Sequence, residues 1–198
     1  MLESLRRAAA EALSPLVEFL RKGGVSPHWL SALSLGAALL AGYTYAVRDI
    51  MFPWLTVSLV ALSGLLDVLD GALARAMGRE SKVGAFVDST FDRMGETAIY
   101  TGILMGGYVD GHLVLLALAF SLIVSYERAR AESLGVSLRG VGVGERAERL
   151  ILLILFTALS RVDLGVVLVL IISLITALHR LIYGAGSLLR VERAAQHA

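Results

Sequence analysis

The chain contains no cysteine, and this absence excludes several kinds of site. There can be no disulfide, no thiolate-bound metal and no cysteine nucleophile. Lysine is also scarce, at Lys22 and Lys82, whereas arginine is abundant. Arginine suits bidentate binding of phosphate, although a GC-rich coding bias would produce the same ratio. The formal net charge is only +1, so we expect no nucleic-acid partner, because domains that bind nucleic acid are usually strongly basic.

Charged residues are few for a soluble protein. They make up 18% of the 198 residues, while 57% are hydrophobic, and the mean hydropathy is +0.74. Soluble domains average roughly 45–50% apolar and about 25% charged residues. The composition therefore predicts that most of the chain lies in a lipid bilayer. The N-terminal residues lack the apolar core of a signal peptide, so we expect the spans themselves to direct insertion.

Residues 1–22 are predicted to form an amphipathic helix that lies on the membrane surface. Their leucines and valine recur every three or four positions, and charged residues mostly occupy the other side. Gly23-Gly24 would end this helix, and Ser26-Pro27 is typical of the start of the next one.

Six apolar segments follow, and they predict an all-α integral membrane protein with six transmembrane helices. About 20 apolar residues are needed to cross the hydrocarbon core. The segments lie at 27–47, 52–77, 83–107, 111–134, 146–161 and 163–185. We therefore expect a surface helix over 1–22, a six-helix membrane domain over 23–186 and a short cytoplasmic tail over 187–198.

The placement of basic residues predicts how the chain is oriented. With the N-terminus inside, only Arg48 and Arg161 of the 18 lysines and arginines fall in outer loops. The loop near residues 78–83 and the segment 128–149 then face the cytoplasm. We expect a multi-pass protein of the cell (plasma) membrane whose functional site faces the cytoplasm.

Four aspartates stand inside the second and third apolar segments, where ionisable residues are costly and usually functional. Asp67 and Asp70 are three residues apart, and Asp88 and Asp92 are four apart, so each pair shares a helix face. The turn between the two segments brings both pairs to matching depth. Clustered carboxylates repel each other, and a divalent cation removes that repulsion. We predict a site for one or two ions of Mg²⁺, Mn²⁺ or Ca²⁺, with pairing to nearby arginines as the alternative.

Small residues surround these aspartates. Gly71 and Gly84 would let a ligand approach the helices closely, although packing between membrane helices also favours small residues. Arg75 lies one turn beyond Asp70, where it could reach a phosphate, and Ser81 in the turn could add a hydroxyl.

The run from Asp67 to Asp92, D-x2-D-G-x2-A-R-x8-G-x3-D-x3-D, resembles the signature of the CDP-alcohol phosphotransferases at every position. Members of that family transfer a substituted phosphate from a CDP-linked donor to an alcohol and release CMP. The resemblance implies that Asp67, Asp70, Asp88 and Asp92 bind two divalent cations, Mg²⁺ or Mn²⁺, at the donor pyrophosphate. It also implies that Asp92 is the general base toward the acceptor hydroxyl. The surface helix and the six spans resemble that family as well.

The resemblance further implies which residues contact the CDP-linked donor. They come from the start of the first span and from the signature. They are His28, Trp29, Leu30, Ser31, Asp67, Gly71, Ala74, Arg75, Ser81 and Gly84. A single histidine at the start of a span is more often an interface residue, so His28 is assigned a donor contact and no chemistry.

Residues 125–132 and 145–150 resemble the phosphatidylinositol-phosphate synthase branch of the family, with S-Y-E-R-A-R-A-E and E-R-A-E-R-L. Arg128, Arg146 and Arg180 come from three different spans near the cytoplasmic side. Together they would form a pocket for the phosphate of an acceptor, because arginine binds phosphate bidentately. We therefore expect inositol 1-phosphate as acceptor and a CDP-linked lipid, CDP-diacylglycerol or CDP-archaeol, as donor.

Several alternatives stay open at this point. The same arginines could pair with neighbouring glutamates, and Arg130 and Arg149 are expected to be of that structural kind. Glycerol 3-phosphate would also suit an arginine pocket, and a CDP-inositol donor would use the same metal site. A cation transporter would explain the aspartates, but not the glycine, alanine and arginine between them. We expect a homodimer, although Gly102, Gly106 and Gly107 could equally serve packing within one chain.

Overall fold

A computed structural model describes residues 13–48 and 53–196 of the chain. A helical segment over 13–22 is followed by six long helices. These are α2 (Pro27–Ala46), α3 (Pro53–Ala76), α4 (Lys82–Gly106), α5 (Gly111–Ser133), α6 (Arg146–Ala158) and α7 (Val162–Gln196). The described residues contain no strand, so the all-α fold is confirmed, and each long helix lies where an apolar segment predicted one.

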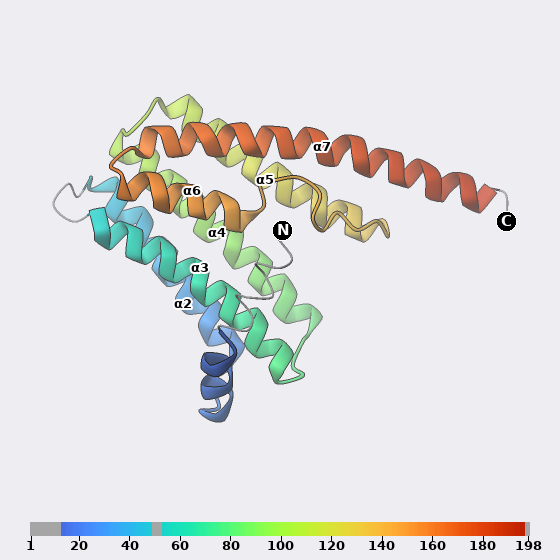
Figure 1. The fold of residues 1–198 in the computed structure, drawn as a ribbon, viewed down its shortest axis with the longest axis horizontal. Helices are drawn as coiled ribbons and strands as arrows, with labels where there is room; N and C mark the ends of the chain where they lie inside the picture. The colour runs from blue at the N-terminus through green and yellow to red at the C-terminus, as the bar shows by residue number, and fades with distance from the viewer. Residues whose placement is uncertain (1–12, 49–52, 197–198) are drawn as a thin grey trace.

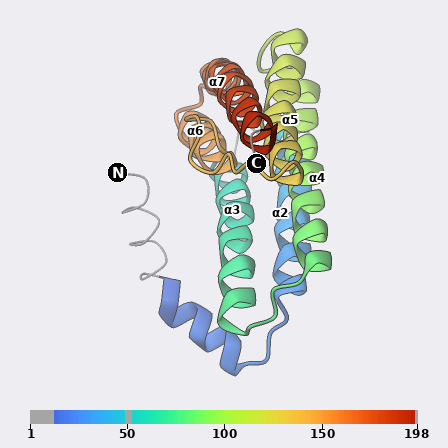
Figure 2. The same ribbon diagram turned by 90° about the vertical axis from the view of Figure 1, so that its right-hand side faces the viewer.

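The six long helices form a closed ring of neighbours (Figures 1 and 2). α2 packs against both α3 and α4, α3 packs against α6, α6 against α7, α7 against α5, and α5 against α4. The main cluster of buried apolar side chains draws on all six helices, and among its members are Tyr45, Val60, Ile103, Leu153 and Val166. In each helix these residues lie toward the same end of the bundle. The other end contains the polar side chains, together with a smaller apolar cluster around Leu69 and Leu73.

The close crossing of α2 and α4 depends on glycine. A Cβ atom at Gly102 would overlap the backbone of Gly42, and one at Gly106 would overlap the carbonyl oxygen of Tyr45. Small residues allow this approach between membrane helices, where dispersion contacts replace the hydrophobic effect as the source of stability. Gly102 and Gly106 therefore serve packing within the chain, and the homodimer stays a prediction.

Within residues 13–48 and 53–196, three helices are long and apolar enough to cross a membrane: Pro53–Ala76, Gly111–Ser133 and the Val162–Arg193 part of α7. Large apolar side chains are exposed on all six helices, as expected of a surface that faces lipid. The count of six spans stays a prediction. The last helix is longer than predicted, because it continues past residue 185 to Gln196 (Figure 1). Residues 187–196 contain neither glycine nor proline, and most are good helix formers.

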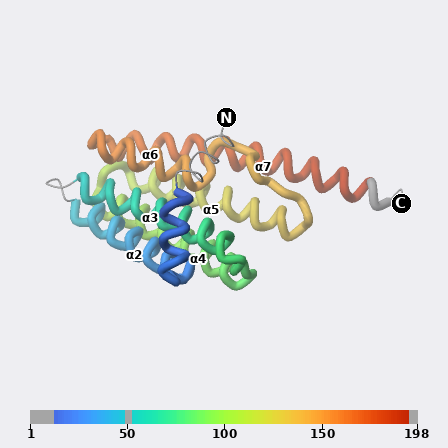
Figure 3. The backbone as a smooth tube through the Cα atoms, turned by 60° about the horizontal axis from the view of Figure 1, so that its bottom comes forward, coloured from blue at the N-terminus to red at the C-terminus, as the bar shows by residue number. Residues whose placement is uncertain are grey.

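The segment over 13–22 lies across the end of the bundle near the end of α3 (Figures 2 and 3). Val17 is buried there against Leu30, Leu69 and Leu73. Its charged residues face outward, where Glu18 pairs with a neighbouring arginine. The amphipathic pattern therefore holds within 13–22, while residues 1–12 of the predicted surface helix lie outside the described residues. Its place on a membrane surface stays a prediction.

Candidate metal centre and substrate cavity

The polar end of the bundle contains a cavity of about 850 Å³. One wall is formed by the start of α2, the second half of α3 and the first half of α4. The other wall is formed by the end of α5, the loop over 134–145, the start of α6 and the second half of α7. Pockets for small molecules commonly measure roughly 300–1,000 Å³, so the cavity is large enough for a nucleotide-sized ligand.

Three of the four predicted aspartates come together in this cavity. Asp67 and Asp70 on α3 and Asp88 on α4 each offer a carboxylate oxygen, and these oxygens lie within 4.8 Å of one another. Asp70 is buried, and its Oδ2 accepts a hydrogen bond of 2.6 Å from the hydroxyl of Ser31 on α2. A site of carboxylate oxygens alone suits Mg²⁺ or Mn²⁺, so the residues present fit the predicted metal.

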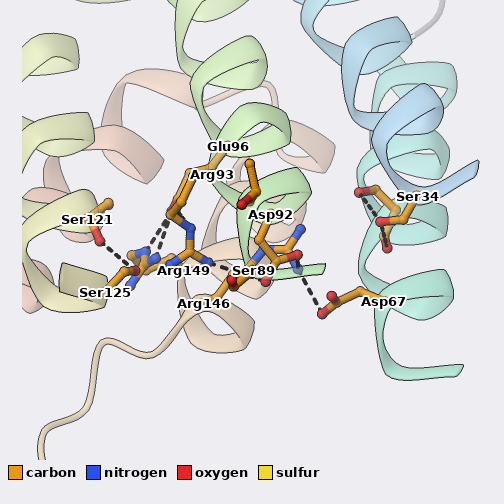
Figure 4. A network of polar contacts seen from close by, with 12 residues as sticks. Ser34, Asp67, Ser89, Asp92, Arg93, Glu96, Ser121, Ser125, Arg146 and Arg149 are labelled. Carbon is orange, nitrogen blue, oxygen red and sulfur yellow. Dashed lines mark hydrogen bonds and ion pairs between the residues drawn. The ribbon is translucent and has the colours of Figure 1, made fainter. Parts of the chain in front are cut away.

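The fourth aspartate contacts an arginine. Arg146, in the first turn of α6, places Nη1 2.8 Å from Oδ2 of Asp67 and also pairs with Oδ1 of Asp92 (Figure 4). Arg93 lies 3.3 Å from the other carboxylate oxygen of Asp92. The two guanidinium groups neutralise part of the negative charge of the cluster. Arg146 was predicted to bind the acceptor, and the structure places it where the aspartates meet the arginine-bearing wall.

Most of the predicted donor-binding residues line the first wall: His28, Ser31, Gly71, Ala74, Arg75, Ser81 and Gly84. A Cβ atom at Gly84 would lie 3.4 Å from the His28 ring and 3.0 Å from Ser81 Oγ, so a side chain there would crowd both groups. Ser81 also caps α4, because its hydroxyl accepts a hydrogen bond of 2.9 Å from the Gly84 amide. This wall therefore combines polar side chains with glycine positions at which a ligand can come close to the backbone.

The structure does not bring Trp29 and Leu30 to the cavity. The Trp29 side chain is 69% exposed, and Leu30 is buried in the apolar cluster with Leu69. Successive helical residues point about 100° apart. His28 and Ser31, three residues apart, face the cavity together, and the two residues between them turn away.

The second wall carries the three predicted acceptor residues, Arg128, Arg146 and Arg180. Arg128 pairs with Glu132 one turn further along α5, at 3.1 Å. Arg180 is only 2% exposed, and it donates to the carbonyl oxygens of Val124 at 2.7 Å and Val141 at 2.9 Å. Its guanidinium thus ties the loop over 134–145 to α5 and α7.

Sequence reasoning missed Arg139 of this wall and also Glu96, which lies on α4 beside the cavity. Glu96 on α4 is buried and binds Arg149, and Arg139 lines the cavity from the loop. The signal for Glu96 was its position four residues after Asp92, which extends the carboxylate-bearing face of α4. For Arg139 the signal was a basic residue beside Gly140 in a segment predicted to face the same side as the aspartates. Arg149 pairs with a glutamate, Glu96, and its structural role stays a prediction.

The chain is similar to known proteins in both sequence and fold. Residues 25–179 match the family model of the CDP-alcohol phosphatidyltransferases. An archaetidylinositol phosphate synthase of Pyrococcus horikoshii is 37% identical over 180 residues, which cover 91% of this chain and 94% of that protein. A crystal structure of Mycobacterium tuberculosis phosphatidylinositol phosphate synthase (PgsA1) with CDP-DAG bound has a TM-score of 0.73 and 28% identity, covering 84% of this chain and 90% of that one. The same protein in complex with manganese and citrate gives a TM-score of 0.74 at 28% identity, covering 86% and 87%.

Proposed function

The chain belongs to the CDP-alcohol phosphatidyltransferase family, and we propose that it transfers a phosphatidyl-type group from a CDP-linked lipid to inositol 1-phosphate. It is a membrane protein and an enzyme, so the transporter alternative is set aside. One observation carries the proposal: a single cavity joins a carboxylate cluster to a wall of arginines. The first feature suits a pyrophosphate with its metal, and the second suits an acceptor that carries its own phosphate.

The donor is assigned to the wall formed by α2, α3 and α4. Arg75 lies over Gly71, with its Nη1 3.4 Å from where a Cβ would stand, and can pair with a donor phosphate. His28 and Ser81 stand close around Gly84, where the absence of a side chain leaves room for a flat ring. Trp29 and Leu30 are left out of this assignment because they do not line the cavity.

The four aspartates would hold two divalent cations, Mg²⁺ or Mn²⁺, which neutralise the pyrophosphate and stabilise the departing CMP. Ser31 holds the Asp70 carboxylate through its hydroxyl. Asp92 would accept the proton of the attacking inositol hydroxyl, because it is the last aspartate of the family signature and its carboxylate lies beside Arg146 of the arginine wall. The hydroxyl oxygen then bonds to the lipid-linked phosphorus, and the bond from that phosphorus to the CMP oxygen breaks.

The acceptor phosphate is assigned to the second wall. Arg128 and Arg146 reach the cavity from α5 and α6, while Arg180 shapes it by holding the loop over 134–145. The relatives support this acceptor, because they are named archaetidylinositol phosphate synthase and phosphatidylinositol phosphate synthase. Glycerol 3-phosphate stays the competing acceptor, because it offers the same phosphate monoester.

We further propose six membrane spans, a plasma-membrane location and a cytoplasmic site. The cavity lies at the end of the bundle that contains the loop near 78–83 and the segment 128–149. That is the side on which lysines and arginines concentrate, as the positive-inside rule requires of the cytoplasmic face.

The experiment is to measure CMP release by the purified protein supplied with Mg²⁺, a CDP-linked lipid and inositol 1-phosphate. Asp70→Asn should lower turnover by at least about a hundredfold while the protein stays folded, because an amide is a poor substitute for a metal-binding carboxylate. Asp110→Asn is the matched control, since this exposed residue lies before α5 and outside the cavity. Normal turnover of Asp70→Asn would refute the assigned metal centre.

A further inference from the structure

Glu96 and Arg149 form a buried ion pair beside the cavity. The Arg149 side chain is 1% exposed and that of Glu96 is 4% exposed. Arg149 reaches Oε1 of Glu96 through Nε at 2.9 Å and through Nη2 at 2.8 Å. A buried ion pair adds little net stability compared with apolar packing, so a role beyond stability is worth testing here.

This pair joins two helices whose backbones do not pack closely. α6 packs against α3 and α7, and α4 packs against α2 and α5, but α4 and α6 are not close neighbours in the ring. Two arginines of α6 span the distance to α4, Arg149 to Glu96 and Arg146 to Asp92 (Figure 4). Of these two ion pairs, only the one between Arg149 and Glu96 is buried away from solvent.

Arg149 also contacts the backbone just before α6. Nη1 of Arg149 donates a hydrogen bond of 2.6 Å to the carbonyl oxygen of Gly144, just before the first turn. The apolar contacts of α6 with the main cluster begin only at Leu150. The first turn, which carries Arg146, is therefore held to α4 by polar bonds rather than by apolar packing. Arg146 lies three residues before Arg149 and thus on the same face of the helix.

We propose that Glu96 and Arg149 are positioning residues that hold Arg146 at the junction of the aspartates and the acceptor wall. Neither residue is assigned to contact substrate. The pair acts through Arg146 and through the carbonyl oxygen of Gly144, so its loss lets the start of α6 move away from α4. The acceptor half of the cavity then loses its shape, while the donor half on α2, α3 and α4 keeps its own. The expected change in acceptor KM rests on the proposed function, whereas the expected movement of α6 does not.

The test uses the absence of cysteine from the chain. Spin labels are attached at Met94→Cys in α4 and at Val143→Cys in the loop before α6. Double electron–electron resonance then measures the distance between the two labels. Both positions are exposed, at 51% and 57%, and neither lines the cavity. The first variant is Glu96→Gln, which leaves Arg149 without its charged partner. The second variant combines Glu96→Gln with Arg149→Gln. It leaves no unpaired buried charge, and it replaces the first variant if the single change prevents folding. Asp163→Asn is the control, because it breaks an exposed ion pair outside the cavity.

We expect both Glu96 variants to show a broader or longer distance distribution than the parent and the control. The acceptor KM should rise by about tenfold, the scale typical of residues that orient a ligand-binding group, while the donor KM changes by less than about twofold. A fall in thermal stability alone, with unchanged distances and unchanged acceptor KM, would show a merely structural pair and overturn the proposal. A wider distance with normal acceptor KM would overturn it as well. If the parent protein released no CMP, the proposed function would fail, and the distances alone would decide the positioning role.

Discussion

Replacing Arg146 with methionine should make the enzyme bind Mn²⁺ more tightly in the absence of substrates. Arg146 pairs with Asp67 at 2.8 Å and with Asp92, two of the carboxylates assigned to the metals. The guanidinium and the cations therefore compete for the same oxygens. Methionine keeps a long unbranched side chain in a site where Arg146 is 14% exposed, but it removes the competing charge.

The size of the effect follows from the exposure of the two ion pairs. The Asp67 and Asp92 side chains are 25% and 18% exposed, so solvent weakens both pairs. Pairs of this kind are each worth about 0.5–1 kcal/mol. Removing both should raise Mn²⁺ affinity roughly five- to thirtyfold, since 1.4 kcal/mol corresponds to about tenfold.

The assay is a titration of free Mn²⁺ followed by electron paramagnetic resonance on purified protein without donor or acceptor. Arg128→Met is the matched control, because Arg128 lines the same cavity but pairs with Glu132 rather than with an aspartate. Its affinity for Mn²⁺ should stay within about twofold of the parent, because solvent and salt screen a more distant charge. Unchanged or weaker Mn²⁺ binding by Arg146→Met would refute the idea that this arginine competes with the metals.

Three further predictions concern single contacts. Ser31→Ala should weaken Mn²⁺ binding by about tenfold in the same titration, because it removes the hydroxyl that orients Asp70; unaltered binding would contradict this. Gly102→Val should lower the unfolding free energy by about 3 kcal/mol or more in detergent, since its side chain would overlap the backbone of α2, whereas Gly36→Ala, with open space around it, should have little effect. Arg180→Met should raise the acceptor KM and speed hydrogen exchange of residues 140–144, because the loop loses its tie to α7; a changed KM with unchanged exchange would instead mean direct phosphate binding.

The metal centre could be predicted because it depends on local spacing. Residues three and four apart share a helix face, and a short turn between two helices sets equal depth for both pairs. Those two rules predicted the cluster, and carboxylate oxygens of Asp67, Asp70 and Asp88 lie within 4.8 Å of one another. The packing of both α3 and α4 on α2, which completes the cluster, is a tertiary contact that the spacing did not reveal. The six long helices could also be predicted, because each apolar segment of the sequence is about as long as a single helix.

The partners of the arginines could not be predicted in the same way. Arg146 and Arg149 lie on one face of α6, and spacing does not tell which of several carboxylates each long side chain reaches. Arg146 meets Asp67 and Asp92, while Arg149 is buried against Glu96. The loop before α6 depends on tertiary contact as well. Gly142 adopts a φ of +93° and packs on α7, and neither feature has a local signal.

The most direct test of the central claim is CMP release by the purified protein with Mg²⁺ and a CDP-linked lipid, compared across inositol 1-phosphate, inositol and glycerol 3-phosphate. The account predicts turnover with inositol 1-phosphate, little with inositol, which lacks the phosphate for the arginine wall, and little with glycerol 3-phosphate. Preference for glycerol 3-phosphate would leave the metal centre intact and overturn the proposed acceptor. Absence of CMP with all three acceptors would contradict the proposed lipid donor.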